Sequence, residues 1–522
     1  MRIDRRGFLR LASGAFALAL GVPAAARAAP GARAVHRATR NTLRGALGVA
    51  LARARARPAA TKSYPEAERI ALPPADGEPL LSLAACVRGS QPPRGFAEAP
   101  LALAELGRLL YLANGVTGRR GGRLLRAAPS AGALYAGEAY VVAERVTELP
   151  PGVYFYSVPD HALLRIAAGP LADEVARSVE RPGALAGAAA FVLLTNVFDR
   201  YMERYADRGY RYALIDSGHI GENLRLAALA AGLGEEGALR FHDDRLNALL
   251  RVDGREEALC ALHGVGPPGE PGVATAPAVR LLVEKSSGGG ERGLGETERY
   301  HEATKLVERN RASAPAADAS AAAEGRAPGV VWELPRGLAP PMRVDEAIRA
   351  RRSADGFESE AIALESLAFV LEMACGHAWL RRAPGVELYV AAHRVADLEP
   401  GLYRYEAGSH RLALLRSREL AGPMVRACLQ REMAGSAAVG LLMVAHIARE
   451  AARTGERSYR DLLVESGAIG QRVYLAAESV GLAARNLAAF LDDWLNGLLE
   501  LDGEERAVVH LTMLGKEVQH PA

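Results

Sequence analysis

The sequence predicts an α+β protein built from two tandem copies of one domain. Residues 210–266 align with residues 459–515 without a gap, at a constant spacing of 249 positions (467 minus 218), and 25 of the 57 aligned residues are identical. A repeat of this length is typical of a duplicated domain and not of a solenoid unit. Each copy mixes the alternating pattern of strands with the periodicity of helices. The 522 residues are also too many for one compact core.

The elements of the first copy follow from their residue patterns. Apolar periodicity predicts a helix over 101–113 and a long amphipathic helix over 213–231, which a glycine follows. Apolar and aromatic runs predict a hairpin with strands over 139–143 and 153–156, and a buried strand over 191–197. No G-x-G-x-x-G sequence follows a strand, so a doubly wound dinucleotide fold is not supported.

The repeat divides the chain into four segments. We expect a signal peptide over 1–28, a first domain over 29–266, a linker over 267–297 and a second, partly degenerate domain over 298–522. The linker is assigned from its Pro-, Gly- and Ser-rich composition.

The N-terminus has the pattern of a twin-arginine export signal. Arg5 and Arg6 are followed by an apolar run over 11–22 and an Ala-x-Ala cleavage site at 26–28. The alternative is a chance Arg-Arg pair before an apolar N-terminus. The signal predicts a periplasmic or otherwise exported protein. Because this route carries folded proteins, it also favours a tightly bound cofactor.

The composition is that of an ordinary globular protein. With 64 basic and 61 acidic residues, the net charge of +3 indicates neither a nucleic acid nor an acidic partner. After signal removal no stretch approaches the length of a membrane span. The four cysteines form no C-x-x-C pair and have apolar neighbours, which predicts buried free thiols, with disulfides as the alternative; they are Cys86, Cys260, Cys375 and Cys428.

Two polar elements recur in both copies, and we assign no metal to either. Asp243-Asp244 and its counterpart Asp492-Asp493 precede Leu-Asn-x-Leu-Leu, where helix capping is favoured over metal binding. A His-x-Ala-Thr element occurs at His36 and again at His301, without a second ligand at suitable spacing.

Four segments of the first copy carry a family resemblance: 126–135 (RAAPSAGALY), 151–156 (PGVYFY), 205–212 (YADRGYRY) and 218–224 (GHIGENL). In this order they resemble the azoline-dehydrogenase-like (SagB-type) branch of the nitroreductase superfamily. The second copy resembles the same family through residues 351–353 (RRS) and its 467–515 half.

The resemblance implies an FMN-binding fold, a central antiparallel sheet wrapped by helices. It also implies homodimers whose two flavin sites lie in the subunit interface and use residues of both chains. Fusing two copies would therefore make an intrachain pseudo-dimer whose two sites are free to diverge.

Arg351, Arg352 and Ser353 are the expected grip for the flavin phosphate and ribityl chain, because guanidinium and hydroxyl groups donate to a dianion. A solvated helix face is the alternative. The first copy has Arg88-Gly89-Ser90 at this place and so lacks the middle charge. Both copies also lack the family's further arginine: Pro92 and Asp355 stand there, and Arg94 is a possible substitute in the first copy.

Pro129, Ser130 and Gly132 form a small-residue loop that lets backbone amides approach a flat ring. An ordinary turn is the alternative, and the resemblance implies flavin contact from the opposite copy. The second copy has lost this loop: the interval from the serine to the next matched tyrosine is 50 residues in the first copy (140 minus 90) and 36 in the second (389 minus 353).

These losses are complementary. One site would combine Arg351, Arg352 and Ser353 with the loop around Ser130, whereas the other would have Arg88 and Ser90 without a loop. We therefore expect one good flavin site per chain, with the second weakened or empty.

Arg204-Tyr205 stands where azoline dehydrogenases carry a Lys-Tyr pair that handles the substrate proton. Tyr205 is the expected general acid or base if the flavin site or Arg208 lowers its pKa, whereas Arg204 cannot release a proton as lysine does. The alternative for Tyr205 is a buried aromatic with a bonded hydroxyl. The second copy has Arg453-Thr454 and has lost this chemistry.

The expected function is FMN-dependent hydride transfer to or from an unidentified small molecule or peptide. Outside the cytoplasm, the electron partner would be a quinone, a redox protein or oxygen. The alternative is a non-catalytic, degenerate module that binds flavin, a peptide or a partner.

Overall fold

The computed structural model describes residues 30–41, 61–89, 95–269, 281–283, 295–308, 330–375, 385–429, 431–487 and 489–518. The expected signal peptide, Ser90, Pro92 and Arg94 lie outside these residues.

Two antiparallel sheets of seven strands have the same strand order, which confirms the α+β class and the two tandem copies. The first sheet runs β1 (Glu68–Ala71), β6 (Ala162–Ala168), β5 (Gly152–Ser157), β4 (Gly137–Ala143), β7 (Ala190–Val197), β9 (Glu257–Gly266), β8 (Gly234–Ala238). The second runs β12 (Val331–Glu333), β15 (Arg411–Ser417), β14 (Gly401–Glu406), β13 (Val386–Ala392), β16 (Val439–Ala445), β18 (Ala507–Gly515), β17 (Ala483–Asn486). Even the irregularities are duplicated, because the β7–β9 register shifts after Leu194 and the β16–β18 register shifts after Met443.

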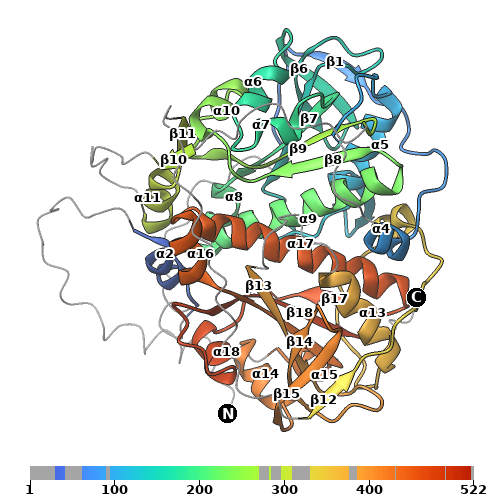
Figure 1. Ribbon diagram of the computed structural model, residues 1–522, viewed down its shortest axis with the longest axis vertical. Coiled ribbons are helices and arrows are strands. Elements are labelled where there is room, and N and C mark those ends of the chain that lie inside the picture. The colour runs from blue at the N-terminus through green and yellow to red at the C-terminus, as the bar shows by residue number, and fades with distance from the viewer. Residues whose placement is uncertain are drawn as a thin grey trace, which may run out of the picture.

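Helices cover the sheets and lie between them (Figure 1). In the first copy they are α4 (Leu83–Gly89), α5 (Leu103–Asn114), α6 (Ala172–Arg177), α7 (Pro182–Leu185), α8 (Asp199–Tyr205), α9 (Arg208–Ala230) and α10 (Asp243–Leu249). In the second they are α12 (Val344–Ala350), α13 (Leu364–Cys375), α14 (Ala421–Ala427), α15 (Met433–Ser436), α16 (Ile447–Thr454), α17 (Ser458–Ser479) and α18 (Asp492–Leu498). The predicted hairpin, buried strand and helices are confirmed. However, α9 begins at Arg208 and not near residue 213, because its first turns are polar residues buried between the copies.

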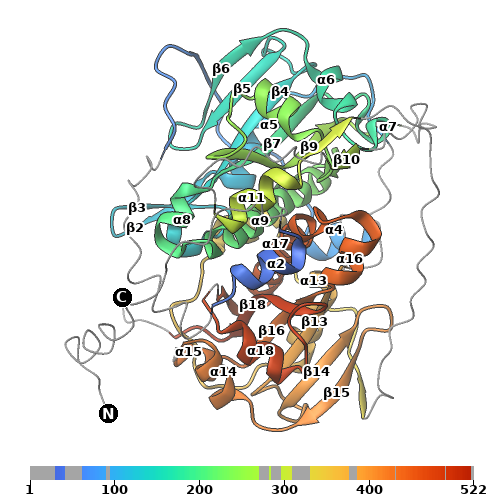
Figure 2. The ribbon, with the colours of Figure 1, turned by 90° about the vertical axis from the view of Figure 1, so that its left-hand side faces the viewer.

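The long helices α9 and α17 run side by side between the two sheets (Figures 1 and 2). They cross at equivalent glycines. A Cβ on Gly218 would lie well inside 3.0 Å of the Val464 carbonyl, and one on Gly467 would do the same to the Ile215 carbonyl. Gly467 follows Gly218 by 249 positions, and Val464 follows Ile215 by the same spacing. The two contacts are therefore equivalent, and the crossing marks a pseudo-two-fold axis through the chain.

Each copy also sends an N-terminal helix onto the other. Helix α2 (Ala32–Ala38), at the start of the first copy, packs beside α16 of the second copy (Figure 2). Helix α11 (Glu296–Ala303) contacts the first copy through Thr297 and His301. His36 Nδ1 lies 2.9 Å from Tyr459 Oη, and His301 Nδ1 lies 3.1 Å from Tyr210 Oη. The recurring His-x-Ala-Thr elements are therefore packing elements of the interface between copies.

The recurring aspartates also belong to this interface, which corrects the capping interpretation. Asp243 accepts from Arg457 at 2.7 Å and Arg460 at 3.1 Å in the second copy. Reciprocally, Asp492 accepts from Arg208 at 2.5 Å and Arg211 at 2.7 Å in the first copy. The side chain that caps α10 is His242, which accepts from the Arg245 N–H.

The fourteen residues missing from the second copy correspond to a short hairpin and the turn after it. In the first copy β2 (Val116–Arg120) pairs with β3 (Arg123–Arg126), and a 3₁₀ turn η1 (Ala131–Ala133) follows. This hairpin extends toward the second copy. Strand β10 (Leu281–Val283) lies within the predicted linker and pairs with β11 (Leu306–Glu308), which follows the linker. Helix α11 begins at the end of the linker.

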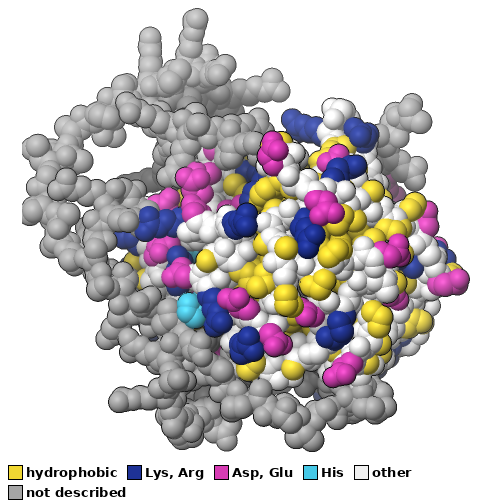
Figure 3. All heavy atoms as spheres, turned by 90° about the horizontal axis from the view of Figure 1, so that it is seen from above, with side chains coloured by type: hydrophobic (Ala, Val, Ile, Leu, Met, Phe, Trp, Pro, Cys, Tyr) yellow, Lys and Arg dark blue, Asp and Glu magenta, His cyan; other side chains and the backbone are white. Residues whose placement is uncertain are grey.

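The four cysteines are free thiols, three of them buried and Cys375 half-buried. Among the described residues no cluster of three or more His, Cys, Asp or Glu side chains is arranged to hold a metal. Within the same part of the chain no helix has both the length and the apolar character of a membrane span. On the end face of the first copy, side chains of both charges are interspersed with apolar ones (Figure 3).

Candidate active site

The Arg-Arg-Ser element of the second copy meets the Pro-Ser loop of the first. Arg351 follows the end of α12 and is buried. Its Nε donates to the Ala127 carbonyl at 3.0 Å, and its Nη2 donates to the Arg126 carbonyl at 3.1 Å. These carbonyls come shortly before Pro129 and Ser130 in the chain. The two elements expected to share one composite site are therefore neighbours in space.

Arg352 and Ser353 continue this junction. Arg352 Nη2 donates to the Thr117 carbonyl of β2 at 2.9 Å, and Ser353 Oγ lies 2.9 Å from Tyr474 Oη of α17. Burial lowers the pKa of Arg351, although not enough to make an arginine neutral near pH 7. The described partners of all three residues are protein groups, so their contact with a phosphate stays a prediction.

Two further arginines, which the sequence did not single out, lie around residues 353–355. Asp355 stands where the family's further arginine was expected, and it pairs with Arg120 of β2. Arg485 Nη1 lies 4.0 Å from the same carboxylate and donates to the Ala354 carbonyl at 2.5 Å. With Arg352 they bring three guanidinium groups to this segment, alongside the carboxylates of Asp355, Glu478 and Glu517. Guanidinium groups are donors that suit a phosphate dianion. Only the folded hairpin brings Arg120 there, so sequence spacing carried no signal for it.

Ser130 begins a hydrogen-bonded chain that runs into the first copy. Its Oγ accepts from the Tyr135 N–H at 2.8 Å and lies 2.6 Å from Tyr201 Oη. The Tyr201 hydroxyl donates to the carboxylate of Asp216. Since Tyr201 uses its one hydrogen on Asp216, the hydrogen between Ser130 and Tyr201 belongs to Ser130. The chain therefore points from the loop toward Asp216.

Asp216 is buried within α9, and burial raises the pKa of its carboxyl to about 7. Hydrogen bonds from Tyr201 and Ser130 and the charge of Arg126 act in the opposite direction but are smaller. A pKa near neutrality suits a group that exchanges protons. The sequence did contain a signal for this residue, because Asp216 and its counterpart Glu465 both come directly before the duplicated Ser-Gly pair.

His219 lies beside this chain, beyond hydrogen-bonding distance of Asp216, and contacts the second copy. Its Nδ1 lies 3.6 Å from Asp216, and its Nε2 lies 2.8 Å from Nδ2 of Asn486. The Asn486 amide is oriented by Thr512, whose hydroxyl donates to Oδ1 at 2.6 Å, so Nδ2 is the donor and His219 Nε2 accepts. Burial, with the charge of Arg351, lowers the pKa of His219 to about 3. The ring is neutral and carries its hydrogen on the side of Asp216.

Tyr205 lies against the loop rather than free above it. A Cβ on Gly132, whose φ is +64°, would lie 2.5 Å from Tyr205 Oη and 3.0 Å from Arg204 Nη1. Burial raises the pKa of Tyr205, and Arg204 opposes this only in part. Arg208 does not lower this pKa, so that condition for acid–base action by Tyr205 is not met; Arg208 is held by Asp492 across the interface. Tyr205 is therefore a protonated hydroxyl at neutral pH.

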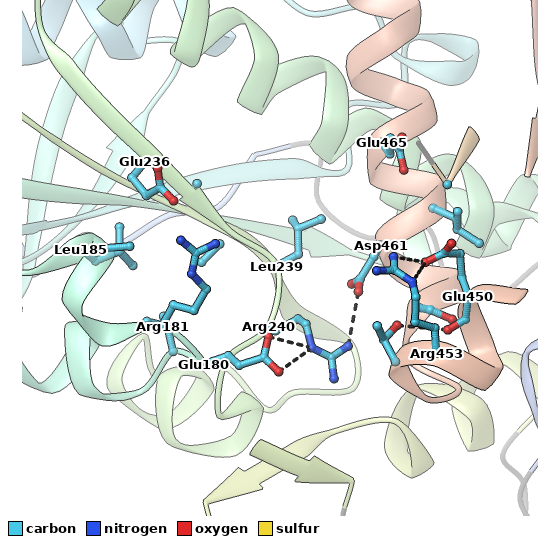
Figure 4. Close-up of a pocket in the computed structure, with 18 residues that line it drawn as sticks. Glu180, Arg181, Leu185, Glu236, Leu239, Arg240, Glu450, Arg453, Asp461 and Glu465 are labelled. Carbon is cyan, nitrogen blue, oxygen red and sulfur yellow. Dashed lines mark hydrogen bonds and ion pairs between the residues drawn. The ribbon is translucent and has the colours of Figure 1, made fainter. Parts of the chain in front are cut away.

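The second, pseudo-symmetric position differs. Arg88 donates to Glu372 of α13 with two 2.8 Å hydrogen bonds and to the Leu338 carbonyl at 2.9 Å. It is thus held at the surface between α4 and α13, and Ser90 lies outside the described residues. A cavity of about 130 Å³ occupies this second position between the copies (Figure 4). Arg453, Thr454 and Glu465 line it, 249 positions after Arg204, Tyr205 and Asp216; Arg88 does not.

This cavity does not fit a flavin phosphate. Its charged lining residues are Glu180, Glu236, Glu450, Asp461 and Glu465 against Arg181, Arg240 and Arg453. A dianion would therefore face an excess of carboxylates, unlike at the arginine-rich surrounding of Ser353.

Comparison with known proteins identifies the class. The family model described as "Nitroreductase family" matches residues 88–266 and again 348–516. A protein of Methanocaldococcus jannaschii named as a nitroreductase is 33% identical over 159 residues, which are 30% of this chain and 79% of that protein. The chain belongs to the nitroreductase family, in two tandem copies.

A solved structure that covers nearly the whole chain shares its fold. A nitroreductase structure from Anabaena variabilis aligns with 93% of this chain and 99% of its own, with a TM-score of 0.73 and 23% identity. A nitroreductase structure from Ralstonia eutropha aligns with 40% of this chain and 94% of its own, with a TM-score of 0.34 and 22% identity.

Proposed function

We propose that this chain is an FMN-dependent oxidoreductase with one flavin site, which transfers a hydride between the flavin and an organic substrate. The observation that carries the proposal is the contact of Arg351 with the carbonyls that precede Ser130. It places the expected phosphate grip of one copy beside the expected ring-contacting loop of the other. The sequence resemblance to SagB-type dehydrogenases supports a substrate that is a small molecule or a peptide.

In this proposal Ser353, Arg352 and Arg485 would hold the phosphate, and the loop from Pro129 to Gly132 would contact the ring. Small residues at this loop leave room for a flat ring. A residue larger than glycine at the exposed position of Gly132 would place its Cβ against the Tyr205 hydroxyl. Bound FMN would supply the acceptor or donor of the hydride. Tyr205, kept protonated by burial, would donate a hydrogen bond to the substrate.

The proton that accompanies the hydride needs a separate path. Ser130 can receive a substrate proton while passing its own to Tyr201, which passes its hydrogen to the Asp216 carboxylate. Each oxygen in this relay gains one hydrogen and loses one, except Asp216, which ends protonated. Its pKa of about 7 allows storage and return of the proton near neutral pH.

The second position supports a stoichiometry of one FMN per chain. There the loop is missing, Tyr205 is replaced by Thr454 and His219 by Ala468, and carboxylates line the cavity. The N-terminal Arg-Arg pattern supports export, and with it a quinone, a redox protein or oxygen as electron partner.

The direct test is the absorbance spectrum of the purified protein. We expect a yellow protein with about one FMN per chain, bleached by dithionite and reoxidised by a quinone or oxygen. Ser353→Ala and Arg352→Ala should lower the FMN content, whereas Arg88→Ala should leave it unchanged. A colourless protein that does not bind added FMN, or a ratio near two, would contradict the proposal.

The alternative is a non-catalytic module, which the degeneration of the second copy favours. The two candidate functions differ in whether the proton relay from Ser130 to Asp216 is used. If the chain is an enzyme, Tyr201→Phe should slow substrate reduction or oxidation at least tenfold and flatten its pH profile while FMN stays bound. Bound FMN that no tested substrate reoxidises or reduces would favour the binding module.

A further inference from the structure

The residues that line the cavity at the second position differ in charge from the corresponding residues of the proposed flavin site. Corresponding residues are 249 positions apart: Tyr201 has become Glu450, and Tyr212 has become Asp461. On the opposite wall, Arg485 corresponds to Glu236. Three neutral or basic positions of one site are therefore acidic in the other, which adds four units of negative charge.

Ion pairs within the wall compensate this charge only in part. Arg240 lies 3.3 Å from Glu180 and 3.5 Å from Asp461, so it joins the two copies (Figure 4). Arg453 pairs with Glu450 in the second copy. Five carboxyl groups and three guanidinium groups line the cavity, and Arg449, outside the lining, also pairs with Glu450 at 3.0 Å. The lining itself therefore keeps a net negative charge.

Glu465 is a half-buried carboxyl group of this wall, next to the buried Glu450. It accepts hydrogen bonds from the backbone of Gly385 and Val386, and burial followed by the charge of Glu450 raises its pKa to about 7, against the charge of Arg472. A cation near Glu465 would favour the ionised form. Figure 4 places Glu465 and Glu236 on opposite sides of the cavity.

A buried hydroxyl in the same wall points independently to a ligand. Ser458 is 2% exposed, lines the cavity, and its Oγ has no hydrogen-bond partner among the described residues. A buried polar atom without a partner costs about 1–3 kcal/mol, so such atoms usually meet a water or ligand. The corresponding residue of the first copy is Gly209, so this hydroxyl is specific to the second site.

We propose that this cavity binds an organic cation, a primary ammonium or guanidinium group on an apolar chain. The charged end would lie between Glu465 and Ser458, since an ammonium donates to a carboxylate and a hydroxyl together. Leu185, Leu239 and Leu462 in the lining supply apolar contact for the chain. The ligand is either a free amine or the side chain of a lysine or arginine in a peptide.

The test is isothermal titration calorimetry of the full mature protein. Cadaverine and a blocked lysine peptide, Ac-Ala-Lys-Ala-NH₂, represent the two sources of the cation; 1-pentanol and glutarate are the neutral and anionic controls. We expect saturable binding of at least one cationic probe, and no binding of the controls. The probe that binds more tightly identifies the source.

Glu465→Gln and Ser458→Ala should each weaken binding of the cation about tenfold. Asp216→Asn, which neutralises the corresponding residue of the other site, should not change it. Ser458→Ala keeps the test valid if Glu465→Gln fails to fold, because it removes only a hydroxyl. The proposal is overturned if neither cation binds, if glutarate binds equally, or if Ser458→Ala leaves the affinity unchanged. The result does not depend on FMN or turnover, so it is separate from the proposed oxidoreductase activity.

Discussion

Gly218 and Gly467 face each other where α9 crosses α17, and each occupies the space that a side chain on the other helix would need. A Cβ at either position would press on a backbone carbonyl of the facing helix, Val464 or Ile215, which cannot move aside as a side chain can. The close crossing holds the two copies in the relation that brings Arg351 to the Ser130 loop. The glycine pair therefore supports the composite site from a distance.

We expect Gly218→Ala to destabilise the protein by about 2 kcal/mol or more, because the added methyl group forces the two central helices apart. Gly497→Ala in α18 is the matched control, since nothing lies within 4 Å of its Cβ position and alanine favours a helix. Urea unfolding followed by circular dichroism measures both. Equal stability of the two variants would show that the crossing tolerates a side chain.

Asp492→Asn should cost about 3–5 kcal/mol, because Arg208 and Arg211 would remain buried without their carboxylate. Asp173→Asn, which removes an exposed i,i+4 pair with Arg177, should change stability by less than about 0.5 kcal/mol. Asp243→Asn should behave like Asp492→Asn because the two networks are reciprocal. Thermal unfolding of the three variants gives the comparison, and a cost for only one of the two networks would contradict the reciprocity.

The pKa of Asp216 makes stability depend on pH. An unfolded Asp titrates near pH 4, whereas the folded group titrates at about 7, so the folded state holds this proton more tightly. Its contribution is fully present below about pH 4 and is lost as the pH rises through about 7. The groups around it are Tyr201, Ser130, Arg126 and His219.

Between about pH 5 and pH 8, the free energy of unfolding of the Asp216→Asn variant should therefore fall less than that of the native protein. Glu465 also titrates at about 7, so Glu465→Gln should have a similar, separate effect, and the native slope contains both. Urea unfolding at the two pH values measures these slopes. An unchanged slope in Asp216→Asn would mean that its pKa is ordinary.

Gly132→Ala should weaken FMN binding about tenfold or more. Its φ of +64° disfavours alanine, and the new Cβ would displace Tyr205 and Arg204. Gly121→Ala has a similar φ of +52° but open space around it, so it reproduces the backbone strain without the contact. Fluorescence titration of the apoprotein with FMN compares the two. Equal loss in both variants would assign the effect to strain alone.

The duplication, the α+β class and the main elements of each copy could be predicted because they depend on local patterns repeated in the chain. The start of α9 was missed, since Arg208 and Arg211 look like solvated residues until Asp492 of the other copy meets them. The capping role given to Asp243 failed for the same reason. A buried ion pair between residues more than 200 positions apart leaves no local pattern.

The candidate site shows the same division. The types of residue at Arg351, Ser353 and Ser130 drew attention through their sequence motifs, and the complementary losses predicted that they share one site. Asp216 and His219 were missed because a polar residue inside a helix has no meaning until its environment is known. Arg120 was missed because a hairpin carries it across to the second copy.

By itself, the sequence determined that one domain occurs twice, that each copy mixes strands and helices, and that the second copy lacks a loop. These properties follow from composition, periodicity and identity along the chain. Only the tertiary structure decided which atoms meet: the glycine crossing, the exchanged arginine–aspartate pairs, the chain from Ser130 to Asp216, and the acidic cavity at the second position. The reason is physical. Desolvation and hydrogen bonding depend on neighbours in space, and here those neighbours come from the other copy.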